Sequence, residues 1–268
     1  MIPFVKAHAY GNDFIYIRKN DLGEHDPVVV AKAICQRNRG VGADGLIIYD
    51  LTSSGGTMRL FNSDGSRAEV SGNGVRGLAA ILMQGDGSKT DFVIETEGGT
   101  KKLAYVEEDR GQLVFRANMG LPSEIQEVVL ETIIGPIQVV TLWMGNPQCV
   151  RIYEGPVPIS NEDGESHLKN LGPALASHSF FPEGTNVELV SVDCLDELRI
   201  WIWERGVGRT ESSGTGACAA AVAAASYGGA SRDVKVLTPG GSQRVEWKDD
   251  GVYLTGSIAI ISDGNWLG

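Results

Sequence analysis

Short runs of alternating apolar and polar residues dominate the chain, and this pattern predicts strands with one buried face. We expect strands at residues 13–17, 45–50, 57–62, 91–97, 102–108, 112–119, 127–134, 137–144, 149–154, 187–193, 197–204, 234–238, 243–248 and 252–261. Helical patterns are fewer, and we expect helices at residues 28–35, 72–83, 168–177 and 214–227. Because strands cluster with only occasional helices, the pattern predicts an α+β fold with mostly antiparallel pairing rather than parallel βαβ winding.

The second half of the chain repeats features of the first. The Gly-Asn dipeptide of residues 11–12 recurs at 145–146, and the Ser-Gly-x-Gly string of residues 71–74 recurs at 213–216. Each Ser-Gly-x-Gly string opens an apolar helical pattern. Internal similarity of this kind indicates a duplicated fold.

The duplication predicts two pseudo-symmetric lobes. We place the first at residues 1–118, to which a C-terminal strand at about 256–268 returns, and the second at residues 119–255. The helix at 214–227 is apolar nearly all round, which is typical of a buried helix. The helix at 72–83 is polar only near Arg76. We therefore expect a curved sheet around a central helix in each lobe, with both helix starts facing a cleft.

The two serine-led helix starts are candidate anion sites. A helix N-terminus presents unpaired N–H groups and a partial positive charge, and glycines let a ligand approach the backbone. Serine is also a common N-cap without a ligand, but the matched second copy favours a carboxylate site. The spacing Gly-x-Gly-x-x-Gly at 72–77 and 40–45 also matches a dinucleotide fingerprint. Polar residues before 72, where a buried strand is needed, argue against a nucleotide.

Charge and composition narrow the class of partner. The chain has 23 Lys and Arg against 34 Asp and Glu, a formal net charge of −11, which disfavours nucleic acid and anionic membranes. No basic leader and no run of 18 apolar residues is present, so we expect a cytoplasmic protein. The four cysteines lie far apart without metal-ligand spacing, so we expect free thiols and no metal.

Polar residues in glycine-rich turns supply candidate binding groups. Neutral amides beside one acid and one base suit a zwitterionic amino acid, although asparagine near glycine is often only a turn former. These candidates are Asn12, Asn62, Asn73, Asn146, Asn186, Glu204 and Arg205.

Longer motifs carry a resemblance to a known family. They are His8-x-x-Gly-Asn-Asp-Phe14, Arg39-Gly-Val-Gly-Ala-Asp-Gly45, Phe61-Asn-Ser-Asp-Gly-Ser-x-Ala-Glu-Val-x-Gly-Asn-Gly-Val-Arg76, Gly145-Asn-Pro147, Phe181-Pro-Glu-Gly-Thr-Asn-Val187 and residues 204–219. On these motifs, which span nearly the whole length, the chain resembles the diaminopimelate epimerases, which are cofactor-independent.

The resemblance implies interconversion of LL- and meso-diaminopimelate by two groups that remove and deliver a proton at opposite faces of Cα. It implies no cofactor and a possible homodimer. In the family the two groups are cysteines at the helix starts, and Ser71 and Ser213 stand at those positions here. Gln148 stands where a histidine is usual, and Arg209 where a glutamate is usual.

The resemblance also implies which residues bind substrate. The amino-acid groups would be bound by Asn12, Asn62, Asn146, Asn186, Glu204 and Arg205, with Glu204 also beside Ser213. The carboxylate would be bound by the backbone of Gly72, Asn73, Gly74, Gly214, Thr215 and Gly216.

A serine hydroxyl has a pKa many units above that of a thiol, and a helix end shifts it by only about one unit. We therefore expect impaired catalysis. Cys218 and Cys149 are expected to be core residues rather than substitutes. Two other classes stay open, namely a non-catalytic amino-acid-binding protein and a related isomerase or dehydratase that uses Glu204 or Asp64. Exchange of both cysteines favours deliberate replacement, whereas Gln148 and Arg209 favour natural divergence.

Overall fold

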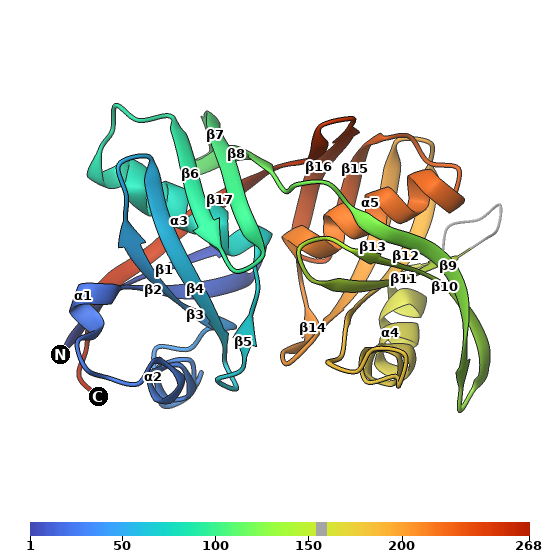
Figure 1. The fold of residues 1–268 in the computed structure, drawn as a ribbon, viewed down its shortest axis with the longest axis horizontal. Coiled ribbons are helices and arrows are strands. Elements are labelled where there is room, and N and C mark those ends of the chain that lie inside the picture. The colour runs from blue at the N-terminus through green and yellow to red at the C-terminus, as the bar shows by residue number, and fades with distance from the viewer. Residues whose placement is uncertain (154–159) are drawn as a thin grey trace. The chain divides into compact units, whose positions relative to one another are not determined.

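The computed structural model describes residues 1–153 and 160–268, and the chain divides into two compact units. Unit 1 comprises Met1–Asn118 and Thr255–Gly268, and unit 2 comprises Met119–Leu254. In each unit strands surround one helix, α3 in unit 1 and α5 in unit 2 (Figure 1). The mixed α+β fold class predicted from the sequence is confirmed.

Unit 1 consists of strands with three helices between them. Its helices are α1 (Lys19–Leu22), α2 (Pro27–Ile34) and α3 (Gly72–Gly85). Its strands are β1 (Ile2–Ala9), β2 (Asn12–Arg18), β3 (Gly45–Leu51), β4 (Gly55–Asn62), β5 (Arg67–Ala68), β6 (Asp91–Thr96), β7 (Gly99–Asp109), β8 (Gln112–Asn118) and most of β17 (Gly251–Trp266). Antiparallel pairs such as β1 with β2 and β3 with β4 predominate. Two pairs are parallel, β2 with β3 and β4 with β6.

Helix α3 lies against strands β1, β2, β4, β6, β7 and β8. Its buried face includes Arg76, which the sequence analysis placed at a polar edge of the helix. The Arg76 guanidinium instead donates to the Asn73 side chain and lies 5.6 Å from the centre of the Tyr10 ring. Hydrogen bonding and the aromatic face thus allow a charged side chain inside the unit.

Unit 2 repeats the arrangement of strands around one helix. Its helices are α4 (Asn161–Ala176) and α5 (Gly214–Tyr227). Its strands are β9 (Ser123–Thr132), β10 (Gly135–Trp143), β11 (Pro147–Tyr153), β12 (Asn186–Cys194), β13 (Glu197–Glu204), β14 (Gly208–Thr210), β15 (Asp233–Thr238) and β16 (Gly241–Lys248). The pairs β11 with β12 and β13 with β15 are parallel. The strand predicted at 149–154 corresponds to β11, and its last residue lies outside the described residues.

Helix α5 lies against β10, β11, β12, β13, β15 and β16, and its residues 214–224 are all buried. The prediction of a buried helix at 214–227 is confirmed. Helix α4 begins at Asn161, seven residues before the predicted start. Its first turns are polar and carry Glu162 and Asp163, so they have no hydrophobic period from which this start could be predicted. The Ser160 hydroxyl accepts from the Asp163 N–H at 3.1 Å and caps that start.

No helix among residues 1–153 and 160–268 has both the length and the hydrophobicity needed to cross a membrane.

Candidate active site

The start of α3 in unit 1 is capped by Ser71. Its backbone is extended, with φ −130° and ψ 125°, and its hydroxyl oxygen accepts from the Gly74 N–H at 3.0 Å. The Tyr16 hydroxyl donates to the Gly74 carbonyl at 3.1 Å from within the core and fixes the same turn. Ser71 is therefore held at the positive end of a buried helix.

The start of α5 in unit 2 has nearly the same geometry. Ser213 has φ −136° and ψ 130°, and its hydroxyl oxygen accepts from the Gly216 N–H at 3.2 Å. The Thr215 hydroxyl lies 3.5 Å from that of Ser213. The repeated sequence thus builds the same N-cap in each unit.

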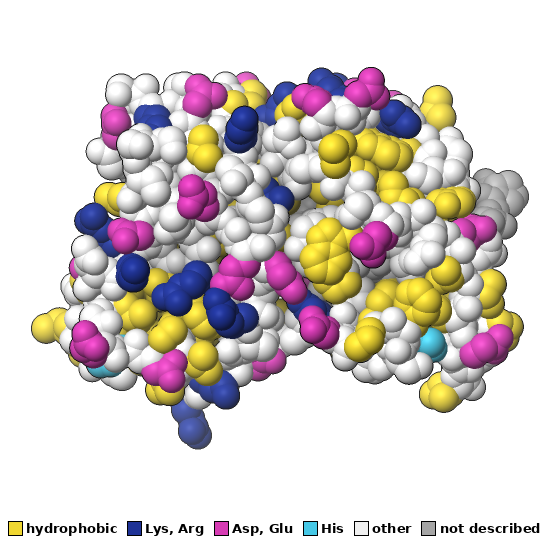
Figure 2. Space-filling model, in the orientation of Figure 1, with side chains coloured by type: hydrophobic (Ala, Val, Ile, Leu, Met, Phe, Trp, Pro, Cys, Tyr) yellow, Lys and Arg dark blue, Asp and Glu magenta, His cyan; other side chains and the backbone are white. Residues whose placement is uncertain are grey.

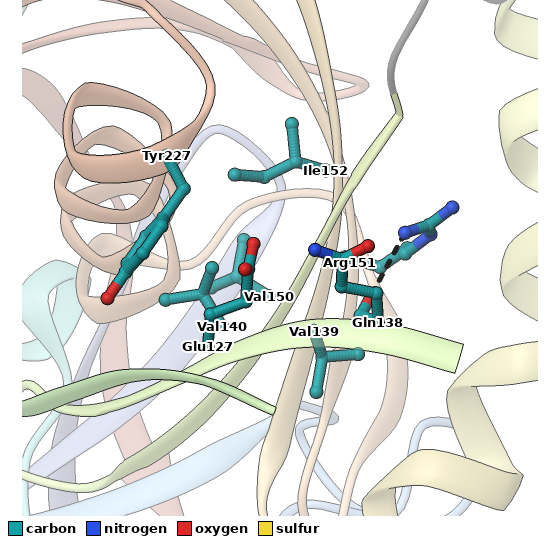
Figure 3. Close-up of a pocket in the computed structure, with 8 residues that line it drawn as sticks. All are labelled: Glu127, Gln138, Val139, Val140, Val150, Arg151, Ile152 and Tyr227. Carbon is teal, nitrogen blue, oxygen red and sulfur yellow. Dashed lines mark hydrogen bonds between the residues drawn. The ribbon is translucent and has the colours of Figure 1, made fainter. Parts of the chain in front are cut away.

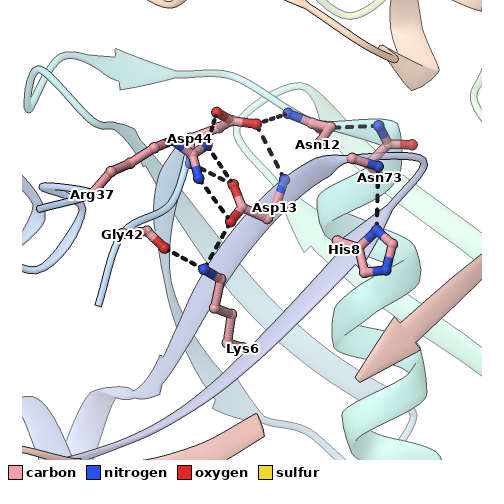
Figure 4. Close-up of polar contacts among 9 residues, drawn as sticks. Lys6, His8, Asn12, Asp13, Arg37, Gly42, Asp44 and Asn73 are labelled. Carbon is pink, nitrogen blue, oxygen red and sulfur yellow. Dashed lines mark hydrogen bonds and ion pairs between the residues drawn. The ribbon is translucent and has the colours of Figure 1, made fainter. Parts of the chain in front are cut away.

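Asn12 lies beside the start of α3 through a chain of hydrogen bonds (Figure 4). The Asn73 side chain donates to Asn12 Oδ1 at 2.9 Å, and Asn12 Nδ2 donates to Asp44 Oδ2 at 2.8 Å. The Asn12 amide is thereby fixed with one N–H left for a ligand. Asn73 is fixed in turn by Arg76.

A charged cluster supports this chain from the surface side. Asp13 accepts from Lys6 and from Arg37, each at 2.9 Å, and Arg37 also lies 2.7 Å from Asp44 (Figure 4). Burial favours a higher pKa for Asp13, but Arg37 and Lys6 outweigh it and lower that pKa. Burial and the Asp13 charge raise the pKa of Asp44. The cluster positions Asn12 through Asp44, which accepts from both Asn12 and Arg37.

Asn62 belongs to a separate turn of unit 1. Its side chain donates to the Ser66 hydroxyl at 3.0 Å, and Ser66 in turn donates to Asp64 at 2.6 Å. Asn62 and Asp64 thus belong to one hydrogen-bonded turn after β4.

Four polar side chains of unit 2 share one face of the parallel pair β11 and β12. Gln148 lies opposite Asn186 in register, and Asn146 and Glu188 follow at spacings of two residues. Side chains two residues apart on a strand point the same way. The register therefore brings together an amide cluster of Asn146, Gln148 and Asn186 with the carboxyl of Glu188.

A backbone group fixes the orientation of these amides. The Arg205 N–H donates to Asn186 Oδ1 at 2.9 Å, so Asn186 Nδ2 faces the Gln148 side chain. The Gln148 oxygen must then accept from Asn186 Nδ2 at 3.3 Å, and its nitrogen donates to Glu188 Oε1 at 2.9 Å and Oε2 at 3.2 Å. Asn146 Oδ1 lies 2.5 Å from the Gln148 amide on its other side, so these two amide groups are in direct contact.

Glu188 is fully buried, and sequence analysis missed it as a site residue. Burial, and then the nearby charge of Glu204, raises the pKa of its carboxyl well above the usual value. The sequence signal was a charged residue in an apolar strand, spaced by two from Asn186. Its surroundings therefore favour the neutral form of this carboxyl over the ionised one.

Glu204 is the last residue of β13, and Arg205 follows it. Glu204 Oε1 accepts from the Thr210 hydroxyl at 3.2 Å, and the Arg205 guanidinium donates to the Glu183 carbonyl at 3.2 Å. Thr210 ends β14, three residues before Ser213. Glu204 is thus tied to the strand that leads into α5.

Arg209 makes an ion pair that a glutamate at this position could not make. Its guanidinium donates two parallel hydrogen bonds of 2.7 Å to Glu165. This pair joins β14 to α4 and accounts for arginine at this position.

A hollow of about 360 Å³ opens beside Gln148 in unit 2. Its lining includes Pro147, Gln148, Phe180 and Glu183, so the Gly-Asn-Pro and Phe-Pro-Glu motifs meet around it. Figure 2 shows hydrophobic side chains on the surface of this unit. The volume is within the range of small-molecule sites.

A second hollow, of about 20 Å³, lies at the other end of α5 (Figure 3). Tyr227, the last residue of α5, lines it together with Val150 and Ile152. A helix of this length places Ser213 about 20 Å away. This hollow is therefore unrelated to the start of α5.

The buried cysteines are core residues, as predicted. Cys218 and Cys149 have no exposed surface, and burial followed by the Glu188 charge raises the pKa of the Cys149 thiol. Cys35 is also buried, and burial raises the pKa of its thiol to about 12. Within the described part of the chain, no three His, Cys, Asp or Glu side chains are grouped as metal ligands.

Comparison with known proteins identifies the family of this chain. The family model described as diaminopimelate epimerase matches residues 4–124 and 140–261. A diaminopimelate epimerase of Synechococcus elongatus is 36% identical over 283 residues, which cover 98% of each chain. One from Desulforudis audaxviator is 36% identical over 286 residues, which cover 99% of each.

A solved structure shows the same fold at lower identity. The protein, described as a probable proline racemase from Agrobacterium radiobacter, matches with a TM-score of 0.75 and 15% identity over 99% of this chain and 92% of that one. Its likeness concerns the fold alone. The family match over most of the sequence and the identity to these epimerases show that the chain belongs to the diaminopimelate epimerase family.

Proposed function

We propose that this chain binds diaminopimelate and epimerises it by a two-base route in which serine hydroxyls replace the proton-transferring groups. Family membership supports the substrate and the isomerase class. The matched N-caps at Ser71 and Ser213 support two equivalent positions, one for each face of Cα. The expected cytoplasmic location and homodimer stay predictions.

Substrate binding is proposed to rest on backbone N–H groups and neutral amides. The starts of α3 and α5 supply N–H groups and helix dipoles for a carboxylate, although the chain carries a net charge of −11. The amides of Asn12, Asn146 and Asn186 are held by neighbouring residues and would meet the substrate already oriented. Preorganised groups of this kind lower the entropic cost of binding.

Proton transfer is the step that the serines impair. A thiol with a pKa of about 8.5 comes within reach of neutral pH at a helix N-terminus. The same dipole, worth about 1–2 kcal/mol, lowers a hydroxyl pKa by roughly one unit only. We therefore infer that diaminopimelate binds normally while proton removal from Cα is slow.

The observation that carries the proposal is the near identity of the two N-caps, which differ by 6° in φ and 5° in ψ. The experiment compares the unmodified chain with Ser71→Cys/Ser213→Cys in deuterated solvent, using LL- and meso-diaminopimelate. We expect binding in both proteins and rapid deuterium incorporation at Cα in the double variant alone. A double variant that binds neither isomer and exchanges nothing contradicts the proposal.

A non-catalytic amino-acid-binding protein is the second candidate. Each serine hydroxyl already accepts a backbone hydrogen bond, which favours a structural role for both serines. This candidate predicts that the double variant binds diaminopimelate but still exchanges no deuterium. The same experiment therefore separates the two functions.

A further inference from the structure

Glu188 is a buried acid that the two-base scheme does not use. It lies on β12 among residues with no exposed surface, and its carboxyl points to the face that the amide cluster occupies. A buried carboxyl carries a large desolvation cost unless it is neutral or well bonded. Its position therefore requires an account in terms of the adjacent site.

The Glu188 carboxyl lies against the first turn of α5. An ideal Cβ built on Gly216 would be 2.6 Å from Glu188 Oε1 and 3.2 Å from the Ser213 hydroxyl oxygen. The two oxygens therefore flank one point, and their separation is at most 5.8 Å. One water molecule can join two oxygens across such a span.

The neighbouring groups leave the acid hydrogen of Glu188 available. Both carboxyl oxygens face the Gln148 nitrogen, which is a donor, so the acid O–H cannot be directed there. The ionisable groups that act on this site are Glu204 from β13 and Cys149 from β11, and the first turn of α5 carries no acidic side chain. No cation among the described residues is a main cause of the Glu188 shift, so a neutral carboxyl is favoured.

We propose that Glu188 supplies the proton that Ser213 delivers to the substrate at Cα. The Glu188 O–H bond breaks as a proton passes, directly or through one water, to Ser213 Oγ. The original Ser213 O–H bond breaks at the same time and a C–H bond forms at Cα. The negative charge of the carbanion ends on the Glu188 carboxylate, which the Gln148 N–H stabilises. Glu188 acts through Ser213 and is a positioning residue.

This inference rests on the proposed function, and its test uses a background in which one thiol is restored. Ser71→Cys supplies a tunable group in unit 1 and leaves Ser213 and Glu188 in place. In this background we expect Glu188→Gln to slow epimerisation of diaminopimelate about 100-fold, the scale of general acid catalysis. The Kd for diaminopimelate should change less than about threefold, because glutamine keeps the shape of the side chain.

The matched controls are Ser213→Ala and Ser213→Cys. If Glu188 acts through the Ser213 hydroxyl, Ser213→Ala should slow epimerisation about as much as Glu188→Gln does. The two substitutions together should slow it no more than either alone. With Ser71→Cys/Ser213→Cys, the thiol carries its own proton, so Glu188→Gln should cost only a few-fold. Thermal melts of each variant check that folding is retained.

Three results overturn the inference while the proposed function stands. The first is that Glu188→Gln slows epimerisation equally when residue 213 is serine and when it is cysteine. The second is that the rate losses of Glu188→Gln and Ser213→Ala multiply when the two are combined. The third is that Ser71→Cys shows no epimerisation although Ser71→Cys/Ser213→Cys is active. Failure of the proposed function is different, because Ser71→Cys/Ser213→Cys is then inactive itself.

Discussion

Gly77 is predicted to be the least replaceable glycine of α3. An ideal Cβ at this position would lie 2.0 Å from the Tyr16 hydroxyl oxygen and 2.6 Å from its Cζ. An ordinary contact is about 3.5 Å, so the Tyr16 ring must move by roughly 1.5 Å. Tyr16 is fully buried and donates to the Gly74 carbonyl in the first turn of α3, so its displacement also disturbs that turn.

The cost of Gly77→Ala is the sum of three effects. Overpacking costs about 1–3 kcal/mol, and the buried Tyr16 hydroxyl that loses its acceptor costs about 1–3 kcal/mol. The helix preference of alanine returns about 1 kcal/mol. The net loss is about 3 kcal/mol, which lowers the Tm by roughly 10 °C for a unit of this size.

Gly85→Ala is the matched control in the same helix. No atom lies within 4 Å of an ideal Cβ at Gly85, and its φ is outside the left-handed region. We expect a change within about 0.5 kcal/mol in urea unfolding, or a slight gain. Equal stability of the Gly77→Ala and Gly85→Ala chains would refute the packing argument.

The remaining predictions concern ionisable and reactive side chains. Burial and Glu204 raise the folded pKa of Glu188 above the unfolded value, so the unmodified chain loses stability relative to Glu188→Gln as pH rises above 4.5, by up to about 1.4 kcal/mol per pH unit. Parallel pH dependences of the two unfolding free energies would contradict this. Arg209 lowers the pKa of Glu165, so their ion pair stabilises the folded chain at pH values above the usual carboxyl pKa. This stabilisation is lost as the pH falls through the lowered pKa. Arg209→Ala should cost about 0.5 kcal/mol at pH 7 and nothing near pH 2, because the pair is partly exposed. Cys194 is exposed and the other cysteines are buried, so a thiol reagent should label one group rapidly and Cys194→Ser should abolish that reaction. Rapid labelling of Cys218 in the native chain would contradict its core position.

The elements with the strongest local patterns were predictable from the sequence. Helix α5 begins and ends where it was predicted, because an apolar run lies between a serine cap and two glycines. Helix α4 was predicted to begin seven residues late, since its polar first turns show no hydrophobic period. The four-residue α1 was not predicted, because so short a helix has no period to detect.

The site was predictable only where local motifs define it. Ser71 and Ser213 follow from N-cap patterns, and their caps were found where expected. The contact of Asn12 with Asp44 depends on the parallel register of β2 and β3, which joins residues 32 apart. Glu188 meets Gln148 through the β11 and β12 register, which a single sequence does not specify.

The central claim is that both serine-capped helix starts act on one α-carbon. A crystal structure of the unmodified chain with LL-diaminopimelate tests it most directly, because slow proton transfer preserves the complex. We predict that the hydroxyl oxygens of Ser71 and Ser213 approach this α-carbon from opposite faces, each at about 3–3.5 Å, the separation of reacting atoms in a near-attack geometry. A bound amino acid whose α-carbon lies against one serine and is remote from the other would contradict the account.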